Sequence, residues 1–252
     1  MSGRAPTTMD ERVVHLSVVI PAFEEAERLG PTLAQVRAYL EHQSFESEVL
    51  VVVDGGRDGT LEMTRRVADG WPALRVFDNG VNHGKGYSVR RGMLEARGRY
   101  LLFSDADLST PIADVERLIA ALDGGADVAI GSRSLAGSDV RTRQVWWRQS
   151  MGRVFNWVVR LVAVGGFQDT QCGFKMFRGD VAEDLFGKQR TTGWGFDVEI
   201  LYIARKRGLR ILEMPIDWYH EPSSKINPVG DSIQMVKDVV LARWRGIIGT
   251  YR

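Results

Sequence analysis

The sequence predicts an α/β fold with a mostly parallel central sheet and flanking helices. Over the first half of the chain, short apolar runs alternate with segments of helical periodicity, which is typical of strands joined through helices. The run Val49–Val53 is apolar throughout, as in a parallel strand that is buried on both faces. Polar clusters follow several of the runs, and ligands of such sheets bind beyond the carboxyl ends of the strands.

The expected elements of the first half follow in strict alternation. Strands are expected at Leu16–Ile20, Val49–Val53, Leu74–Phe77, Tyr100–Phe103 and Val128–Ile130. Helices are expected near Pro31–His42, Leu61–Asp69, Gly86–Ala96 and Pro111–Leu122. In the first helix, Leu33, Val36 and Leu40 share one face. In the last, Pro111 suits a first helical turn that Thr110 caps.

The pattern changes after about residue 131. A long helix rich in tryptophan and arginine is expected at Arg141–Val164, followed by a strand at Phe174–Arg178, a helix at Gly195–Arg207 and a strand at Leu209–Trp218. We therefore expect a flexible tail at 1–12 and one domain at 13–230, with a nucleotide-binding half to about 131 and an acceptor half after it. Residues 231–252 are expected to form an amphipathic helix.

Composition excludes several classes. The 252 residues include 33 basic and 32 acidic ones, which argues against a uniformly basic nucleic-acid binder, so no nucleic-acid partner is expected. The one cysteine excludes a disulfide framework and fits a reducing cytosol. The longest uncharged run, Val13–Phe23, is shorter than the roughly 20 residues of a bilayer span. No signal peptide is expected, because the first twelve residues lack an apolar core.

Asp105 and Asp107 directly follow the strand expected at Tyr100–Phe103. Two carboxylates one residue apart can share one divalent cation, and hard oxygen ligands suit Mg²⁺ or Mn²⁺ completed by substrate phosphates. The alternative is a solvated turn in which an aspartate caps the next helix.

Three further polar clusters follow strands. Asp54 ends a buried strand and could accept a hydrogen bond from a base or ribose, while Gly55 allows close backbone approach to a ligand. Glu24 and Glu25 could face a ligand or precede a helix N-terminus favourably. Lys85 lies between two glycines at a helix start, which is a potential anion site. The Asp54 segment could instead be a tight turn in which Asp58 or Thr60 caps the next helix, and the loop around Lys85 could equally have no function.

Competing enzyme classes fit less well. The segment around Gly84 and Gly86 resembles a dinucleotide fingerprint, but its third glycine is missing and it follows the third strand. The four histidines show no metal-ligand spacing, and the serine-hydrolase elbow and the P-loop pattern are absent.

Together these segments resemble an inverting family 2 glycosyltransferase with the A-type, Rossmann-like fold. More narrowly they are similar to the polyprenyl- and dolichyl-phosphate sugar synthases, in particular the dolichyl-phosphate β-glucosyltransferase branch. The resemblance covers about residues 15–226. It rests on the segments Val18–Glu25, Asp54–Thr60, Asn82–Gly86, Phe103–Pro111, Gly131–Arg133, Asp169–Lys175, Gly193–Glu199 and His220–Lys225.

The resemblance implies a nucleotide-sugar site and a metal site. The donor would be bound by Pro21, Ala22, Glu24, Glu25, Asp54, Gly55, Lys85, Asp105 and Ala106. Asp107, with Asp105, would hold Mg²⁺ or Mn²⁺ on the diphosphate. The chain departs from the family at Phe23, Glu24, Val53 and Gly56, where a tyrosine, an asparagine, an aspartate and a serine are usual. These positions bear on the choice of nucleotide more than on the reaction.

The resemblance also implies a lipid-phosphate acceptor. Such a phosphate is mostly dianionic at neutral pH, so a strong general base is less necessary than for a hydroxyl acceptor. Arg133, Lys175 and Lys225 are the cations expected to bind it. Asp169, Gln171 and Asp197 are the catalytic candidates that orient the sugar or take a proton, although Arg133 and Lys175 could instead form salt bridges and Asp197 could be a first-turn acid.

Two segments suggest a membrane surface. Apolar residues from Trp147 to Val162 share one helical face with arginines opposite, as in an in-plane interfacial helix. The stretch Lys237–Arg252 places Trp244, Ile247 and Ile248 among basic residues. A core-packed helix and a dimer helix are the respective alternatives, the latter implying a homo-oligomer.

We therefore expect a peripheral enzyme at the cytoplasmic face of a membrane, which moves glucose from UDP-glucose onto a polyprenyl or dolichyl phosphate. Alternatives are a GDP-mannose-dependent mannosyltransferase on such a lipid and a soluble transferase with a small phosphorylated acceptor. A catalytically silent nucleotide-sugar-binding protein is disfavoured, because both Asp105 and Asp107 are intact.

Overall fold

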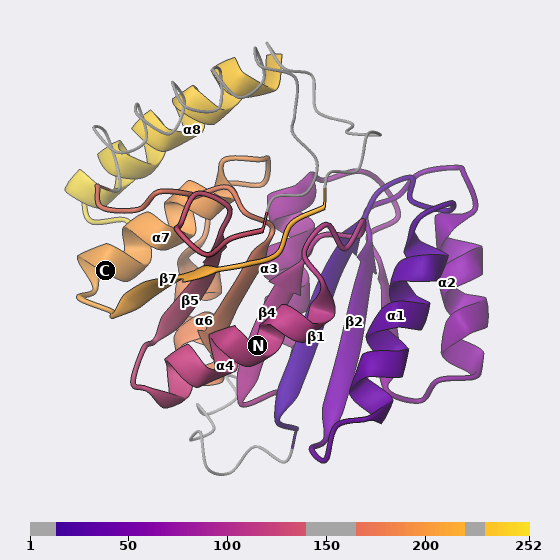
Figure 1. The fold of residues 1–252 in the computed structure, drawn as a ribbon. Helices are drawn as coiled ribbons and strands as arrows, with labels where there is room; N and C mark the ends of the chain where they lie inside the picture. The colour runs from indigo at the N-terminus through magenta and orange to yellow at the C-terminus, as the bar shows by residue number, and fades with distance from the viewer. Residues whose placement is uncertain (1–13, 140–164, 220–229) are drawn as a thin grey trace.

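A seven-stranded sheet forms the centre of the molecule in this computed structural model, which describes residues 14–139, 165–219 and 230–252 (Figure 1). The strands are β1 (Leu16–Ala22), β2 (Ser47–Val53), β3 (Leu74–Asp78), β4 (Tyr100–Ser104), β5 (Val128–Ser132), β6 (Phe174–Arg178) and β7 (Ile211–Pro215). Their order across the sheet is β3-β2-β1-β4-β6-β5-β7. All neighbours are parallel except β6, which runs antiparallel to β4 and to β5. The predicted α/β fold with a mostly parallel sheet is confirmed.

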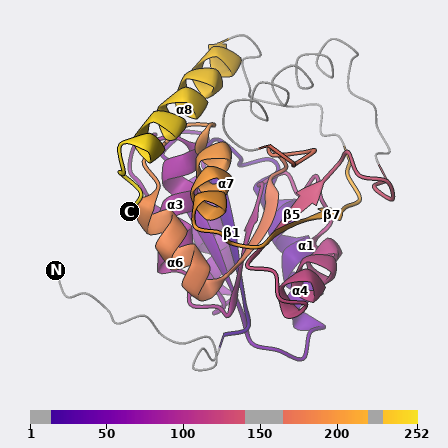
Figure 2. The same cartoon turned by 90° about the vertical axis from the view of Figure 1, so that its left-hand side faces the viewer.

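Helices cover both faces of this sheet. They are α1 (Leu29–Glu41), α2 (Thr60–Asp69), α3 (Lys85–Glu95), α4 (Val115–Asp123), α6 (Gly179–Lys188), α7 (Phe196–Lys206) and α8 (Gly230–Ile247), and a 3₁₀ turn at Ile112–Asp114 leads into α4. Helices α1 and α4 lie on one face, while α3, α6 and α7 lie on the other (Figure 2). Helix α8 packs against α7 at the edge of the molecule (Figure 1).

Two apolar clusters, one on each face, explain why the central strands read as continuous apolar runs. Successive side chains of a strand point to opposite faces. Val18 and Ile20 of β1 accordingly join the cluster under α1 and α4, whereas Val19 joins the one under α3 and α7. Each of these three side chains has no exposed surface, as expected for a parallel strand covered on both faces.

Strand β7 is shorter than the expected Leu209–Trp218. Its first expected residue belongs to the end of α7, where Gly208 has φ +73° and the amide of Leu209 bonds to the carbonyl of Ala204 at 3.1 Å. This is a Schellman ending, which uses Leu209 to satisfy the helix carbonyls. At the other end, β7 stops at Pro215, which has no N–H for the ladder.

Two other differences concern helices. Helix α6 has no counterpart among the predicted elements, because the sequence between Phe174–Arg178 and Gly195 carries only a short apolar stripe. The helix expected at Arg141–Val164 and the tail at 1–12 lie outside the described residues. No helix in the described part of the chain is long and apolar enough to cross a membrane.

Candidate active site

The carboxyl ends of β1, β2 and β3 meet at one edge of the sheet. The register pairs Ala22 with Val53, and Val53 with Asp78, so the loops that follow these strands start side by side. Strand β4 also runs parallel to β1 and ends at Ser104, immediately before Asp105. The topology therefore gathers the polar clusters that the sequence places after separate strands.

Asp54 holds the loop that leads into α3. Its side chain is buried, and its Oδ2 accepts the backbone amide of Gly84 at 2.8 Å, while Oδ1 accepts Asn79 Nδ2 at 2.7 Å. Both of its oxygens also lie within 3.2 Å of the His83 amide. Asp54 thus connects the end of β2 to the loop before Lys85, a role that the sequence does not indicate.

Gly55 fits a position that no other residue could occupy without strain. Its φ is +75°, and a Cβ there would lie 2.9 Å from the backbone nitrogen of Asn82. The close approach is therefore to the protein's own 81–82 backbone. Pro21 and Ala22 lie at the buried end of β1, and the backbone amide of Asp54 bonds to the Ala22 carbonyl at 2.8 Å.

The backbone at the acidic pair after β1 is held by Asp58 and Thr60, which accept the amides of Ala26 and Glu25. Glu25 forms a two-pronged ion pair with Arg28, with Nε and Nη2 each 2.7 Å from a carboxylate oxygen. Glu24 has φ +53°, which is unusual for a residue with a side chain. Asp58 accepts the Ala26 amide and the Thr60 amide and hydroxyl, and these hydrogen bonds lower its pKa despite its partial burial.

Lys85, the first residue of α3, points at Asp105. Its Nζ lies 2.6 Å from Asp105 Oδ1 and 4.8 Å from the centre of the Trp194 ring. Burial alone would lower the pKa of Lys85, but the carboxylates of Asp105 and Asp197 outweigh it and raise the pKa. Lys85 is therefore a fully charged cation. It lies at the N-terminus of a helix, so its charge and the helix terminus both favour a bound anion.

The segment Asp105–Asp107 turns sharply after β4. Asp107 Oδ1 accepts the Ser109 amide at 3.0 Å, and Leu108 between them has φ +47°. Ala106 is buried, and its carbonyl accepts the hydroxyl of Thr32 at 2.7 Å. The turn is thus anchored to α1 and presents the two carboxylates beyond the sheet.

The two carboxylates fit a divalent cation that is shared with a substrate. No group of three or more His, Cys, Asp or Glu side chains within residues 14–139, 165–219 and 230–252 could hold a metal by itself. Magnesium-type cations are commonly held by one or two carboxylates and by substrate phosphates, which is the donor set that Asp105 and Asp107 leave to be completed. The Asp105 carboxylate also packs against the backbone of Gly173, where a Cβ would lie 1.9 Å from Asp105 Oδ2.

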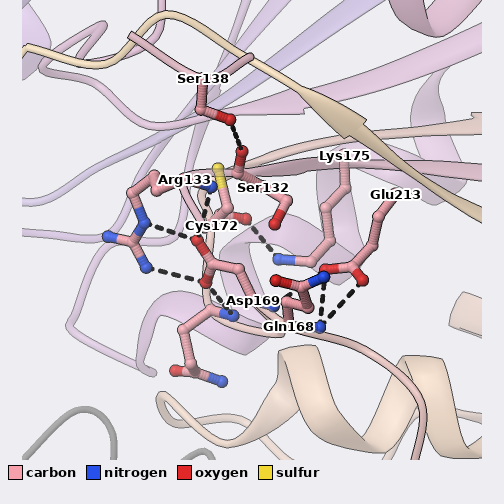
Figure 3. Close-up of polar contacts among 9 residues, drawn as sticks. Ser132, Arg133, Ser138, Gln168, Asp169, Cys172, Lys175 and Glu213 are labelled. Carbon is pink, nitrogen blue, oxygen red and sulfur yellow. Dashed lines mark hydrogen bonds and ion pairs between the residues drawn. The ribbon is translucent and has the colours of Figure 1, made fainter. Parts of the chain in front are cut away.

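Arg133 and Asp169 form a two-pronged pair at the end of β5 (Figure 3). Arg133 Nε and Nη2 lie 2.6 and 2.9 Å from the two carboxylate oxygens, and the guanidinium also lies 5.5 Å from the centre of the Trp218 ring. Burial would raise the pKa of Asp169, but the charge and hydrogen bonds of Arg133 hold it below its usual value. Arg133 is therefore neutralised by its own partner.

The loop that carries Asp169 is fixed from two sides. Glu213 of β7 accepts the backbone amides of Gln168 and Asp169 at 2.9 Å (Figure 3). Asp169 Oδ1 in turn accepts the Gln171 amide at 3.2 Å, while the buried side-chain nitrogen of Gln171 has no hydrogen-bond partner in the described part of the chain.

Lys175 is buried and already paired, unlike the exposed acceptor-binding cation that the sequence predicts. It lies in β6 and is 1% exposed, and its Nζ contacts Asp197 Oδ1 at 2.6 Å. The same Nζ donates to the carbonyl of Cys172 (Figure 3). Asp197 lies in the first turn of α7, and burial raises its pKa although Lys175 and Lys85 oppose the shift. The pair lies beneath the surface, with side-chain exposures of 2% and 6%.

The structure thus brings together three ion pairs, Lys85–Asp105, Arg133–Asp169 and Lys175–Asp197, with Asp107 beside them. Lys225 lies outside the described residues. Three neighbours have no predicted role: Asn79, Gly173 and Trp194. The signals for Trp194 are its place between two glycines, which permits a close-packed turn, and its position in the segment Gly193–Glu199 that carries the family resemblance.

The model of the family "Glycosyl transferase family 2" matches residues 17–186 of this chain. The chain belongs to glycosyltransferase family 2. A Drosophila melanogaster member named dolichyl-phosphate beta-glucosyltransferase is 37% identical over 262 residues, which covers 98% of this chain and 80% of that protein. A Dictyostelium discoideum protein of the same name is 35% identical, covering 95% and 77%.

Solved glycosyltransferases share the fold. Glucosyl-3-phosphoglycerate synthase from Mycobacterium tuberculosis, in complex with phosphoglyceric acid, superposes with a TM-score of 0.70 at 17% identity, covering 96% of this chain and 86% of the other. The same enzyme in complex with Mn²⁺, UDP-glucose and phosphoglyceric acid gives a TM-score of 0.68 at 16% identity, with the same coverage. This family 2 chain therefore has the expected A-type glycosyltransferase fold.

Proposed function

We propose that this family 2 enzyme transfers glucose from UDP-glucose onto a dolichyl or polyprenyl phosphate and forms a β-linked lipid-phosphate sugar. The observation that carries the proposal is the similarity, over nearly the whole chain, to proteins named dolichyl-phosphate beta-glucosyltransferase. The cluster of alternating charges at the carboxyl edge of the sheet supports it, because such a reaction must place two phosphate groups close together.

The donor would bind over the ends of β1, β2 and β4. In this proposal Pro21, Ala22, Glu24, Glu25, Asp54 and Gly55 shape the nucleoside end, and Lys85 and the 105–106 backbone face the diphosphate. Asp107, with Asp105, would hold Mg²⁺ or Mn²⁺. Such a cation, when bound, stabilises the negative charge that develops on the leaving diphosphate.

The chemistry requires one bond to break and one to form. A phosphate oxygen of the lipid attacks the anomeric carbon in line, the bond from that carbon to the diphosphate oxygen breaks, and UDP leaves with inversion. The acceptor dianion is already nucleophilic, so the chain's residues mainly orient the two substrates. Arg133 and Lys225 are the cations proposed to face the acceptor phosphate, since Arg133 retains an exposed fraction of 31%.

The buried pair receives a different part in this proposal. Lys175 and Asp197 lie behind the ligand-facing groups, so we assign the lysine's effect on the acceptor phosphate to its charge rather than to direct contact. Asp197 likewise acts on Lys85 through its charge, which raises the pKa of Lys85. Asp169 and Gln171 remain as the groups that orient the sugar, with Asp169 acting through its hold on Arg133.

We propose that α8 and the segment after it bring the enzyme to a membrane surface, at the cytoplasmic face. Five of the eight large apolar side chains exposed in the described part of the chain lie here, at Val240, Leu241, Trp244, Ile247 and Ile248. Their spacing puts them on one face, opposite the buried Val239 and Ala242 that pack inward. A tryptophan within an apolar stripe flanked by Lys237 and Arg243 suits an anionic lipid surface.

A transfer assay with purified chain tests the reaction. UDP-glucose, GDP-mannose and no donor are each combined with dolichyl phosphate, a bacterial-length polyprenyl phosphate or 3-phosphoglycerate, with Mg²⁺ or Mn²⁺. We expect a glucolipid from UDP-glucose only, with UDP released in equal amount. Transfer from GDP-mannose, or to phosphoglycerate but not to lipid, would contradict the proposed donor or acceptor.

Vesicle co-sedimentation tests the surface. The chain should bind vesicles that contain anionic lipid at low salt, and Trp244→Ser with Ile247→Ser should reduce binding at least about tenfold. A Val81→Ser variant, which removes an exposed apolar side chain elsewhere, is the matched control. Unchanged vesicle binding of the double variant, or its conversion from dimer to monomer in light scattering, would assign the stripe to another partner.

A further inference from the structure

Glu199 of α7 is a buried carboxylate that joins the nearby backbone at 190–191 to two side chains from the C-terminal region, Arg245 and Tyr251. It has no exposed surface, and its Oε2 accepts the backbone amides of Arg190 and Thr191 at 3.0 and 2.7 Å. Its Oε1 accepts the Tyr251 hydroxyl at 2.5 Å and lies 3.4 Å from Arg245 Nη1. Glu199 therefore ties the C-terminal helix region to the start of the loop that precedes α7.

The same helix region contacts the other end of that loop. The backbone amide of Gly195 bonds to the carboxylate of Asp238 in α8. A Cβ at Gly195 would lie 2.4 Å from the Asp238 Cβ, so the Asp238 side chain packs directly on the Gly195 backbone. Helix α8 and Tyr251 thus hold the segment 190–195 at both ends.

This segment packs directly on the start of α3, where Lys85 lies. A Cβ on Gly84 would lie 2.6 Å from the Thr192 carbonyl, and the Tyr87 amide bonds to that carbonyl at 3.1 Å. Gln189 Nε2 donates to the Gly86 carbonyl at 2.8 Å. The ring of Trp194, in the middle of the segment, lies over Lys85 Nζ. A shift of the segment would therefore move Lys85.

We propose that Glu199 and Tyr251 are positioning residues for donor binding: through the segment 190–195 they hold Lys85 in place to contact the diphosphate of the nucleotide sugar. This inference rests on the proposed function of Lys85. It gives Tyr251, which is 166 residues from Lys85 in the sequence, a part in the donor site. Neither residue touches the substrate in this proposal.

Tyr251→Phe removes the hydroxyl that bonds to Glu199 and keeps the ring. Because hydrogen bonds to charged groups are among the stronger ones, we expect UDP affinity by calorimetry, with Mg²⁺ present, to fall about 5- to 10-fold. The KM for UDP-glucose should rise with it, while the KM for lipid phosphate stays unchanged. Tyr202→Phe is the matched control, because Tyr202 packs against Tyr251 but its hydroxyl lies 3.5 Å from the Arg243 carbonyl and not on Glu199.

A double-mutant cycle shows whether the effect passes through Lys85. Lys85→Met alone should weaken UDP binding, and adding Tyr251→Phe to it should weaken binding little further. Should Tyr251→Phe prove thermally unstable, Arg245→Met removes a second, partly exposed contact of Glu199 and should raise the same KM.

The outcomes separate this inference from the proposed function. If Lys85→Met weakens UDP binding but neither Tyr251→Phe nor Arg245→Met does, the positioning role is wrong and the donor site stands. Equal losses in Tyr251→Phe and Tyr202→Phe, or full additivity with Lys85→Met, would also overturn it. If Lys85→Met binds UDP normally, the donor role of Lys85 and this inference fail, while the proposed reaction stands on its own transfer assay. If the chain does not bind UDP, the proposed function fails with them.

Discussion

Lys175 Nζ lies 2.6 Å from Asp197 Oδ1, and both side chains are almost wholly withdrawn from solvent. The lysine comes from β6 and the aspartate from the first turn of α7, where a negative charge is favoured by the helix dipole. The pair therefore connects the antiparallel strand of the sheet to the helix that follows the Trp194 loop. It also adds a second carboxylate to the surroundings of Lys85.

Breaking this buried pair should destabilise the fold. Lys175→Met leaves the Asp197 charge buried and should cost about 3–5 kcal/mol in urea unfolding at pH 7. The double variant Lys175→Met with Asp197→Leu removes both charges and should recover most of the loss. A single variant as stable as the wild type would show that Asp197 has another compensating partner or is already neutral.

Removing the negative charge at Asp107 should abolish the effect of the divalent cation. Asp107→Asn keeps an oxygen that can accept the Ser109 amide, so the turn should persist. We expect transfer to fall by about 100-fold or more, which is the scale for losing one preorganised electrostatic group. Mg²⁺ should no longer tighten UDP binding in this variant, whereas Asp69→Asn on the α2 surface should behave as wild type. Metal-enhanced binding that survives in Asp107→Asn would remove Asp107 from the metal site.

The Arg133–Asp169 pair should make stability fall in acid. The pKa of Asp169 is lowered in the folded state. The contribution of its charge to the free energy of unfolding is therefore complete above the unfolded pKa of about 3.9, and it is lost as the pH falls through the folded pKa. Asp169→Asn should therefore be less stable than wild type by about 3 kcal/mol between pH 5 and 7. This gap should close below about pH 4 in urea titrations. A gap that widens in acid would reverse the assigned sign.

Gly173 should tolerate no side chain because of Asp105. In Gly173→Ala the new Cβ would lie 1.9 Å from Asp105 Oδ2, so the carboxylate must leave Lys85 or the loop must shift. We expect donor affinity to fall about tenfold, which corresponds to roughly the loss of one charge-assisted contact. Gly187→Ala in α6, where nothing lies within 4 Å, should stabilise slightly and leave UDP binding unchanged. Normal UDP binding by Gly173→Ala would mean that the Asp105 geometry is not needed.

Cys172 should be chemically inert in the folded protein. Burial raises its pKa to about 12, so the reactive thiolate is scarce at physiological pH. A disulfide reagent such as DTNB should label it at pH 8 only as fast as the protein unfolds, and the rate should increase sharply in urea. Rapid labelling of native protein would show that the loop before β6 opens locally.

The sequence predicts the strands and most helices because their signals are local. Apolar runs with period two or with two buried faces mark β1 to β5, and Pro111 marks the turn before α4. The antiparallel insertion of β6 between β4 and β5 is not predicted. Strand pairing is chosen by contacts between residues far apart in the chain, and a run such as Phe174–Arg178 looks the same in either direction.

The residue types of the candidate site, and their place beyond strand ends, were determined by the sequence alone, through motifs and their order. Only the tertiary structure decided which charged side chains form ion pairs with one another. Arg133 pairs with Asp169, 36 residues further along the chain, and Lys175 pairs with Asp197, 22 residues further along. The cations that the sequence predicts to bind a phosphate therefore already have carboxylates beside them. The reason is physical: burying a charge is costly unless it is paired, and which partner is near depends on the folded chain and not on spacing in the sequence.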